Sequence, residues 1–578
     1  MKIVSRILLL SLTFVAVGVH SQESKSTNQE TLRQQLALEQ STLLSDLHSL
    51  DDQSLNLSSL ARASIKAEVA DAAWDIDRQW SKKLLTKAYE LTWPPEDDLG
   101  RGRDVPIGSQ PAPPTQSDQA RRAIRNRIVQ IAAKDQAFAD ELIHSGVKPL
   151  GRVEVQLSYA SLAADAWRNN DLDSAGRYLM QSAELDPSQI AAGFLIADIA
   201  RNNREKADDL IVLYLQRLMA FPLSSRNDSL FRVYLVVARL IFPPPEVKPP
   251  AARVMRAYVT FVIQSMTSLE QREPGSLVTY RPLFLRAYPI LKEYAPELAS
   301  EFLTLEAKSR TPGSPSSVDA AAADLLKSRQ EKQSKDISEN ETPTERDINE
   351  RISKHEFVKA RKLVDKLPDL ADRERLFELI NAKEALYLVG QNNILQARTL
   401  AEKLQRARSI QEVYVGLILK CIANKDDSLA QDLMIQAMKQ LKSSNSLATR
   451  GPLDMPVTLA PTSRDIDPIL DGMAKLTIAI SSSSFDVALL GLGEIVTRAN
   501  QSEIDTAQGR PGFDITIFKK LVPKDESRVR LAAESFKDPV RRLLSLAVIN
   551  QWRASSISER EKALRANSKS AVSVGVKN

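Results

Sequence analysis

The chain has 578 residues and a formal net charge of +5, with 43% apolar, 26% charged and only 5% aromatic residues. Its 19 glycines are less than half of the ~7% that is usual in proteins. Many short strands joined by tight turns need more glycine and more aromatic residues, so the composition argues against a β-sandwich or a β-barrel. So small a charge on so long a chain also gives little support to a nucleic-acid binder, which needs a concentrated basic surface.

The N-terminal segment 1–21 has the pattern of a secretory signal peptide. Lys2 and Arg6 precede an apolar run at 7–19, which is short compared with the ~20 residues of a membrane span. Val19 and Ser21 fit the positions before a cleavage site ahead of Gln22. We therefore expect export to a periplasmic or extracellular location. The alternative is an uncleaved N-terminal anchor, which would be the contact of this chain with a membrane.

Most of the remaining chain has apolar residues at helical spacing, and no sustained alternation typical of strands interrupts it. The pattern predicts an all-α protein. Helical spacing is found at positions 29–93, 117–144, 153–186, 190–202, 204–220, 229–241, 251–267, 280–308, 347–442, 469–500 and 514–565.

The clearest boundary is the segment 309–346, which is polar, charged and poor in large apolar side chains. Such a composition is typical of a flexible, disordered linker. We therefore expect a helical block at 22–308, this linker, a second helical block at 347–566 and a disordered tail at 567–578. Such a linker would let the two blocks move independently.

One window, from Gln156 to Gln189, has the pattern of a helix pair. Apolar residues lie on one face of its first half, the Asn-Asn-Asp sequence at 169–171 marks a turn, and Pro187 closes the second half. Small residues at Ala163 and Ala175 allow two antiparallel helices to approach closely. The window resembles a tetratricopeptide repeat at five positions, which are Leu162, Ala163, Ala175, Leu179 and Pro187.

The window departs from that family at Tyr159, where tryptophan is commoner, and at Ala166, where tyrosine is commoner. Looser copies follow in the second block, where alanines recur at similar intervals and Cys421 falls on the core face of the last copy. The alanines are Ala360, Ala397 and Ala430. Ser81, Leu84, Leu85 and Ala88 indicate a further copy near the N-terminus. A recurrence close to the length of a tetratricopeptide repeat favours an α-solenoid of antiparallel helix pairs. The alternative is a helical bundle whose alanines only line a core.

The resemblance implies a function in protein binding, because stacked helix pairs form an extended groove. In repeats of this kind, first-helix residues line that groove. Here these residues would be Ala160, Ala164, Trp167 and Arg168. Tryptophan and arginine are enriched at binding hot spots, so a protein or peptide partner is expected. Trp167 could alternatively pack between repeats.

The motifs that usually carry catalysis or bind metals are missing from the sequence. The four histidines have no metal-binding spacing, and the single cysteine, Cys421, can form neither an internal disulfide nor a cysteine-rich zinc site. Gly491 and Gly493 lack the third glycine of a dinucleotide-binding loop, so they are interpreted as helix-packing residues. We therefore expect no catalytic residue, no metal and no cofactor.

The sequence leads to an exported, non-enzymatic helical-repeat protein that acts as an interaction scaffold or adaptor. Two alternatives remain open at this stage. One is a helical cell-envelope hydrolase that acts on peptidoglycan or polysaccharide, because paired carboxylates cannot be recognised among 73 acidic residues. The other is a structural envelope component that self-assembles through the ends of its repeats.

Overall fold

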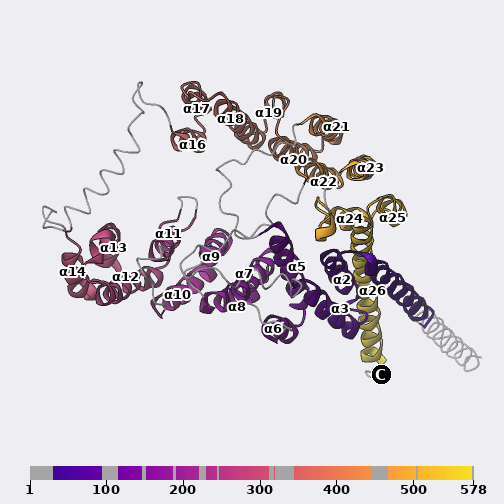
Figure 1. Ribbon diagram of the computed structural model, residues 1–578, viewed down its shortest axis with the longest axis horizontal. Helices are drawn as coiled ribbons and strands as arrows, with labels where there is room; N and C mark the ends of the chain where they lie inside the picture. Colours follow the sequence, from indigo (N-terminus) through magenta and orange to yellow (C-terminus); the bar gives the residue numbers. More distant parts are fainter. Residues whose placement is uncertain are drawn as a thin grey trace, which may run out of the picture. The chain divides into compact units, whose positions relative to one another are not determined.

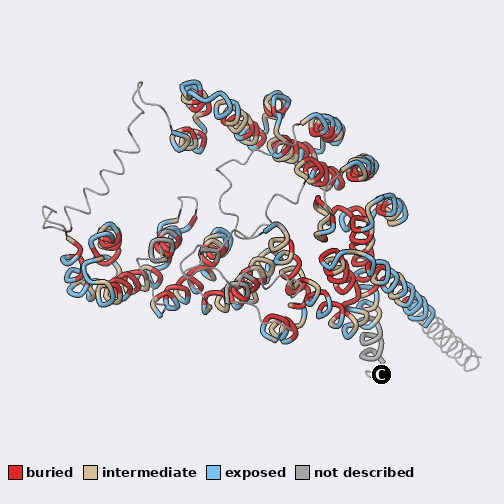
Figure 2. The backbone as a smooth tube through the Cα atoms, in the orientation of Figure 1, coloured by how far each residue is buried: buried red, intermediate tan, exposed pale blue. Residues whose placement is uncertain are grey.

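The computed structural model describes residues 30–93, 115–145, 152–185, 190–220, 229–243, 247–310, 318, 344–444, 467–502 and 506–575. Within these residues the protein consists of helices without any strand, which confirms the all-α fold class (Figure 1). The predicted signal peptide and most of the predicted linker lie outside the described residues. The helices have buried and exposed sides, as expected for amphipathic helices that pack against neighbours (Figure 2).

The chain forms two compact units, and the first of them is discontinuous in sequence. Unit 1 comprises Met1–Ile131, Thr342–Met455 and Pro461–Asn578, and unit 2 comprises Ala132–Glu341 with Pro456–Ala460. This division differs from the two successive blocks at 22–308 and 347–566 that the sequence pattern predicts.

Unit 1 contains a helix over positions 30–53, most of α5 and the helices of the C-terminal half. Their bounds are α2 Ser59–Ala73, α3 Arg78–Leu91, α5 Gln116–Ala132, α16 Glu345–Ser353, α17 Phe357–Val364, α18 Leu370–Gly390, α19 Ile394–Ala401, α20 Ala407–Ala423, α21 Asp427–Ser443, α22 Pro468–Ile480, α23 Phe485–Gln501, α24 Thr516–Leu521, α25 Glu526–Glu534 and α26 Pro539–Gly575, with the 3-10 turns η1 Ser54–Asn56 and η6 Thr506–Gln508. Since α26 continues to Gly575, helix replaces most of the tail that the sequence predicts to be disordered.

Unit 2 consists of helices that follow one another along the chain. Their bounds are α6 Gln136–Ser145, α7 Arg152–Arg168, α8 Leu172–Leu185, α9 Ile190–Asn202, α10 Arg204–Ala220, α11 Ser229–Ile241, α12 Ala252–Arg272, α13 Arg281–Tyr294 and α14 Ala299–Lys308, with the 3-10 turns η3 Ser276–Tyr280 and η4 Pro296–Leu298.

Four helix pairs share one turn geometry, in which a single residue adopts a left-handed backbone conformation. These residues are Asn170 (φ 60°), His355 (φ 59°), Asn392 (φ 63°) and Lys425 (φ 62°). In each turn the next residue donates its backbone N–H to the carbonyl five residues before it, at 2.8 or 2.9 Å. This bond satisfies a carbonyl that the helix end leaves without a partner, so it closes the first helix and fixes where the second begins.

Each second helix then buries a small residue four positions after its N-cap residue. In the four turns above, these residues are Ala175, Ala360, Ala397 and Ala430, and each is 0% exposed. Ser81 in α3, Ala207 in α10 and Ala488 in α23 occupy the same position and are also 0% exposed. A small side chain there lets the two helices of a pair approach closely. Because this feature recurs from one pair to the next, the chain is a helical-repeat protein.

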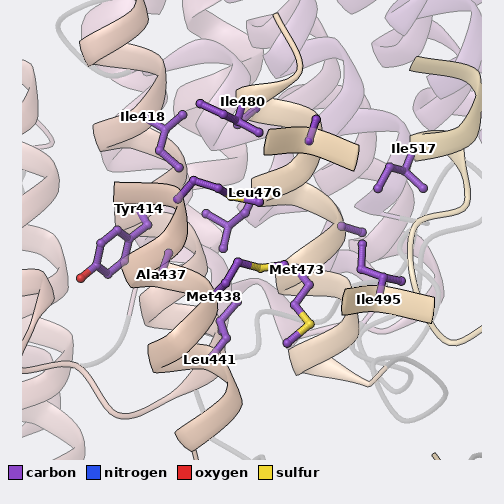
Figure 3. Close-up of a cluster of buried hydrophobic side chains, with 14 of the residues drawn as sticks. Tyr414, Ile418, Ala437, Met438, Leu441, Met473, Leu476, Ile480, Ile495 and Ile517 are labelled. Carbon is purple, nitrogen blue, oxygen red and sulfur yellow. The ribbon is translucent and has the colours of Figure 1, made fainter. Parts of the chain in front are cut away.

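The pairs α16/α17, α18/α19, α20/α21 and α22/α23 stack in sequence order, because each first helix after α16 contacts elements of the preceding pair. Figure 3 shows part of the shared core, to which α20 contributes Tyr414 and Ile418, α21 contributes Leu441 and α22 contributes Leu476 and Ile480. All five side chains are fully buried. In this part of the chain the pairs therefore share a core, and none of them is an isolated hairpin.

In unit 2 the helices α8, α10 and α12 are joined by ion pairs as well as by apolar packing. Lys206 pairs with Asp173 at 2.7 Å, and Arg253 pairs with Asp209 at 2.8 Å. Lys206 is 32% exposed and its three counterparts are more than half exposed, so each pair contributes at most about 1 kcal/mol. The ion pairs therefore fix the register between neighbouring pairs more than they stabilise the unit.

The N-terminal helices of unit 1 pack against its last helix. α2 lies along α26 (Figure 1), and the helix over positions 30–53 runs antiparallel to it. Arg553 of α26 binds Asp46 at 2.7 Å, and Glu561, further along α26, accepts a hydrogen bond from Gln40 at 3.4 Å. The contacts advance along α26 while they move back along the N-terminal helix, so the two helices run in opposite directions. The contacts therefore join the N-terminal helices to the last helix of the chain. The predicted boundary did not anticipate this, because a local apolar pattern does not encode which distant helix will cover it.

A polar cluster fixes α2, α5 and α26 together inside unit 1. Arg127 of α5 donates two hydrogen bonds to the carboxylate of Glu68 in α2, at 2.7 and 2.9 Å, and a third to Asp71 at 2.8 Å. Gln551 of α26 donates to the same Glu68 carboxylate at 2.6 Å. Bidentate pairs of this kind are geometrically specific, so the cluster defines how the three helices meet.

Candidate functional site

The window that resembles a tetratricopeptide repeat forms the pair of α7 and α8. Tyr159 of α7 donates its hydroxyl to Asp140 of α6 at 3.0 Å and stacks on Tyr178 of α8 at 6.3 Å between ring centroids. Burial, together with the charge of Asp140, raises the pKa of the Tyr159 hydroxyl above its usual value. Tyr159 thus serves as a packing residue between α6, α7 and α8.

The four residues predicted to bind a partner lie between the middle and the C-terminal end of α7. Ala160, Ala164 and Trp167 follow one another at spacings of four and three, so they share one stripe of the helix. Ala160 is buried, whereas Ala164 and Trp167 are half-buried. Arg168 is the last residue of α7, and its side chain lies outside what the structure describes. The prediction that these residues contact a partner stays a prediction.

The same stripe recurs on two first helices of unit 1, α18 and α20, but not on α16, where Glu345 and Asn349 occupy two of the three positions. Counted back from the left-handed turn residue, Ala160, Ala164 and Trp167 lie ten, six and three positions before Asn170. The residues at the same three positions of α18 and α20 are all apolar as well. They are Ala382, Leu386 and Val389 in α18, and Val415, Leu419 and Ile422 in α20.

The stripe on α20 is the most open of the three. Leu419 is 50% exposed, and Val415 and Ile422 are half-buried. A Cβ placed on the neighbouring Gly416 would lie 3.3 Å from Leu386 of α18, so the first helices approach closely beside the stripe. The residues predicted from the sequence did not include these stripes, although counting back from the turns at Asn392 and Lys425 would have found them.

A second set of exposed apolar side chains lies on the second helices of unit 1. It comprises Val358, Leu395, Ile435, Leu490 and Leu531, one on each of α17, α19, α21, α23 and α25. Their exposed fractions lie between 62% and 77%. They are distributed one to a helix, and single exposed apolar residues are normal on protein surfaces. A substitution in this set is therefore a suitable control for one in the stripe.

The described residues contain no group of three or more His, Cys, Asp or Glu side chains arranged to hold a metal ion. Cys421 is buried in α20, as its repeat position predicts, and burial raises the pKa of its thiol. The ring of His48 lies against Trp80 at 4.0 Å, and His355 stacks on Tyr387 at 4.4 Å. The structure therefore does not bring these histidines together.

None of the described helices is both long and apolar enough to cross a membrane. No protein-family model matches the sequence, and no curated protein matches it. A search of solved structures found a protein described as a circular tandem repeat protein with novel repeat topology and enhanced subunit contact surfaces. It shares 13% sequence identity over 91% of this chain and 99% of that chain, with a TM-score of 0.15. So low a TM-score carries no argument, and the repeat architecture rests on the helix pairs themselves.

Proposed function

We propose that this is an exported, non-enzymatic helical-repeat protein that binds a protein or peptide partner on the first helices of its repeats. The observation that carries the proposal is the apolar stripe that recurs before the turns of α7, α18 and α20. Packing inside a pair does not explain why Leu419 is 50% exposed at a position that is apolar in all three helices. A partner segment that covers the stripe would remove this side chain from water.

We further infer that the repeats are of the tetratricopeptide type. The left-handed residues His355, Asn392 and Lys425 recur at intervals close to the length of a repeat in that family. In such repeats the first helices line the binding groove. The stripe of Trp167 and the stripe of Leu419 would then be equivalent surfaces in two separate units.

The proposed mechanism is binding through apolar contacts, without a catalysed reaction. A partner side chain would pack beside Trp167, an anchor type that is common at binding hot spots. Export to the periplasm or the cell exterior rests on the N-terminal signal pattern alone. Among the residues that the structure describes, no specific observation favours the alternative of an envelope hydrolase.

Affinity capture with matched variants tests the proposal. The mature chain, from Gln22 to Asn578, is used to capture partners from an envelope extract of its own organism. The captured proteins are identified by mass spectrometry. Leu419→Asp places a charge on the α20 stripe, and Leu395→Asp places the same charge on an equally apolar, more exposed residue of a second helix. Trp167→Ala tests the stripe of unit 2.

We expect a partner that is retained by the wild-type chain and by Leu395→Asp and is lost by Leu419→Asp or by Trp167→Ala. Circular dichroism and thermal unfolding of each variant show whether it is folded. A partner that every variant retains would contradict the first-helix surface. Failure to capture any protein, combined with glycan hydrolysis by the same preparation, would contradict the scaffold itself.

A further inference from the structure

A small pocket in unit 2 is lined by three arginines from three different helices. Arg201 lies near the end of α9, Arg204 begins α10 and Arg239 lies near the end of α11. The remaining wall is apolar, with Leu240 and Val247 as its larger members. Its volume is about 20 Å³, more than the ~10–15 Å³ that one water molecule needs, so it can admit the tip of a polar side chain. No helix pattern in the sequence groups these arginines.

Arg204 is buried and held in place, with only 9% of its side chain exposed. Its Nε donates to Asp208 at 2.7 Å, and Nη2 donates to the same carboxylate oxygen. The other oxygen of Asp208 accepts the backbone N–H of Ala251 at 3.1 Å. Among the described residues, Nη1 of Arg204 has no hydrogen-bond partner. The guanidinium is thus fixed beside the pocket, and the N–H groups of Nη1 are not used by any described residue.

Arg239 is exposed and is positioned by an aromatic ring. Its guanidinium carbon lies 5.2 Å from the centroid of Phe194, and within the described part of the chain it forms no ion pair. Arg201 has an ion pair with Asp198 at 3.0 Å, in which both side chains are more than half exposed. Exposed pairs are weak, so Arg201 can exchange that partner for a ligand at little cost.

We infer that this pocket binds a carboxylate of an acidic peptide segment. Three guanidinium groups surround one pocket. Among the described residues, Asp208 pairs firmly with Arg204 and Asp198 pairs weakly with Arg201, so positive charge is in excess. Arginine recognises carboxylates through directed N–H groups. The apolar wall accepts the aliphatic carbons that carry an aspartate or glutamate carboxylate.

The charge balance favours a carboxylate over a phosphate. Arg201, Arg204 and Arg239 carry three positive charges, and Asp198 and Asp208 carry two negative charges, so one positive charge is in excess, which a single carboxylate balances. The inference rests on the proposed function, because it names the chemistry of a segment that a partner protein would present to unit 2.

The test measures binding of a fluorescein-labelled peptide of alternating glutamate and alanine to the mature full-length chain by fluorescence anisotropy. The matched peptide has glutamine in place of glutamate. The test variant is the double change Arg201→Ala and Arg239→Ala, which leaves the structural Arg204 in place. The control variant is Arg217→Ala, an exposed arginine of α10 that is paired with Glu184 and does not line the pocket.

We expect the double variant to bind the glutamate peptide at least about tenfold more weakly than the wild type, because two charge-assisted contacts are lost. Arg217→Ala should stay within about twofold, since its ion pair is exposed. Propionate should compete with the peptide at lower concentration than inorganic phosphate does.

Equal binding by the wild type and the double variant would overturn the inference, as would equal binding of the glutamine peptide. Stronger competition by phosphate would overturn the choice of a carboxylate. Failure here would leave the proposed function intact if Leu419→Asp still loses its captured partner, because Leu419 belongs to unit 1. The two results are therefore distinguishable.

Discussion

The backbone of Gly509 lies directly against the backbone of Leu60, although the two are far apart in the sequence. A Cβ atom placed on Gly509 would lie 2.5 Å from the carbonyl oxygen of Leu60, a distance that real Cβ atoms do not show. Gly509 also has φ +75°, a conformation that side chains disfavour. Both the close contact and the backbone conformation therefore require glycine at the point where α2 meets the segment that leads to α26.

We predict that Gly509→Ala lowers the free energy of unfolding of unit 1 by roughly 2–4 kcal/mol, the sum of a left-handed backbone cost and a steric clash. Gly275→Ala is the matched control, because Gly275 has φ +83° but nothing within 4 Å of an added Cβ. It should cost about 1 kcal/mol, from the backbone conformation alone. Urea unfolding followed by circular dichroism measures both changes, and equal losses would contradict the close contact with Leu60.

Gly491 and Gly493 of α23 should respond to alanine in opposite directions. A Cβ on Gly491 would lie 2.5 Å from the Thr477 hydroxyl and 2.9 Å from Met434, so Gly491→Ala should destabilise unit 1 by about 1–3 kcal/mol. Gly493 has nothing within 4 Å, and Gly493→Ala should stabilise by about 0.5–1 kcal/mol because alanine favours helix. Thermal unfolding gives both signs, and a loss at Gly493 would show that it too is a packing residue.

Arg541 connects α26 to two segments that precede it. Its side chain is only 2% exposed, and it donates from Nε to the carbonyl of Pro511 at 3.0 Å and from Nη1 to the carbonyl of Ala499 in the last turn of α23. Burial lowers the pKa of the guanidinium, and the charges of Asp538 and Asp467 oppose that effect.

We predict that Arg541→Met costs about 2–4 kcal/mol, because it leaves buried carbonyls without a donor. Arg542→Met changes a half-buried neighbour and should stay within about 0.5 kcal/mol. Chemical unfolding of the two variants gives the comparison. A small effect at Arg541 would mean that water replaces its hydrogen bonds.

Cys421 should be unreactive in the folded protein. Its side chain is 1% exposed, and burial, aided by the charge of Asp426, raises the pKa of the thiol and so reduces the thiolate that reacts. We expect native Cys421 to react with a thiol reagent at least about a hundredfold more slowly than in denaturant, because reaction requires opening. Fast native labelling would contradict the core position of this face of α20.

The same shift predicts how stability depends on pH. The thiol pKa is higher in the folded state than the unfolded value of ~8.5, so its contribution is complete below that pH and is lost as pH rises through the folded pKa. The unfolding midpoint should therefore fall less for Cys421→Ala than for the wild type as pH is raised from about 8 to about 10. Identical pH profiles would mean that other groups dominate.

The repeat was predictable where a local requirement leaves a mark on the sequence. Ala175, Ala360, Ala397 and Ala430 were found because two helices can approach closely only at a small residue. Ala207, which is followed by Leu210 as Ala360 is by Leu363, carried the same signal and was missed. The fold class and the helix pairs could thus be predicted from short patterns.

Contacts between distant segments were not predictable in this way. Arg201, Arg204 and Arg239 line one pocket only because three helices stack, and no spacing along the chain indicates it. Likewise, α2 and α26 each present an apolar face, but nothing local identifies one as the partner of the other. The two blocks predicted from the sequence therefore contain the helices that the structure shows. The structure differs by placing the segment 30–131 in the unit of the C-terminal helices instead of the N-terminal block.

The discontinuous unit predicts the behaviour of a cut chain. If a specific protease site is inserted within the segment 319–341 and cleaved, the N-terminal fragment keeps α2 and the C-terminal fragment keeps α26. Because these helices share buried surface and the hydrogen bonds of Gln551 to Glu68, we expect the two fragments to co-elute in size-exclusion chromatography under native conditions and to separate in denaturant. Gly509→Ala should lower the denaturant concentration at which they separate, whereas Gly493→Ala, which lies away from this contact, should not. Separation in native buffer would instead support two independent blocks, with the segment 22–308 as one of them.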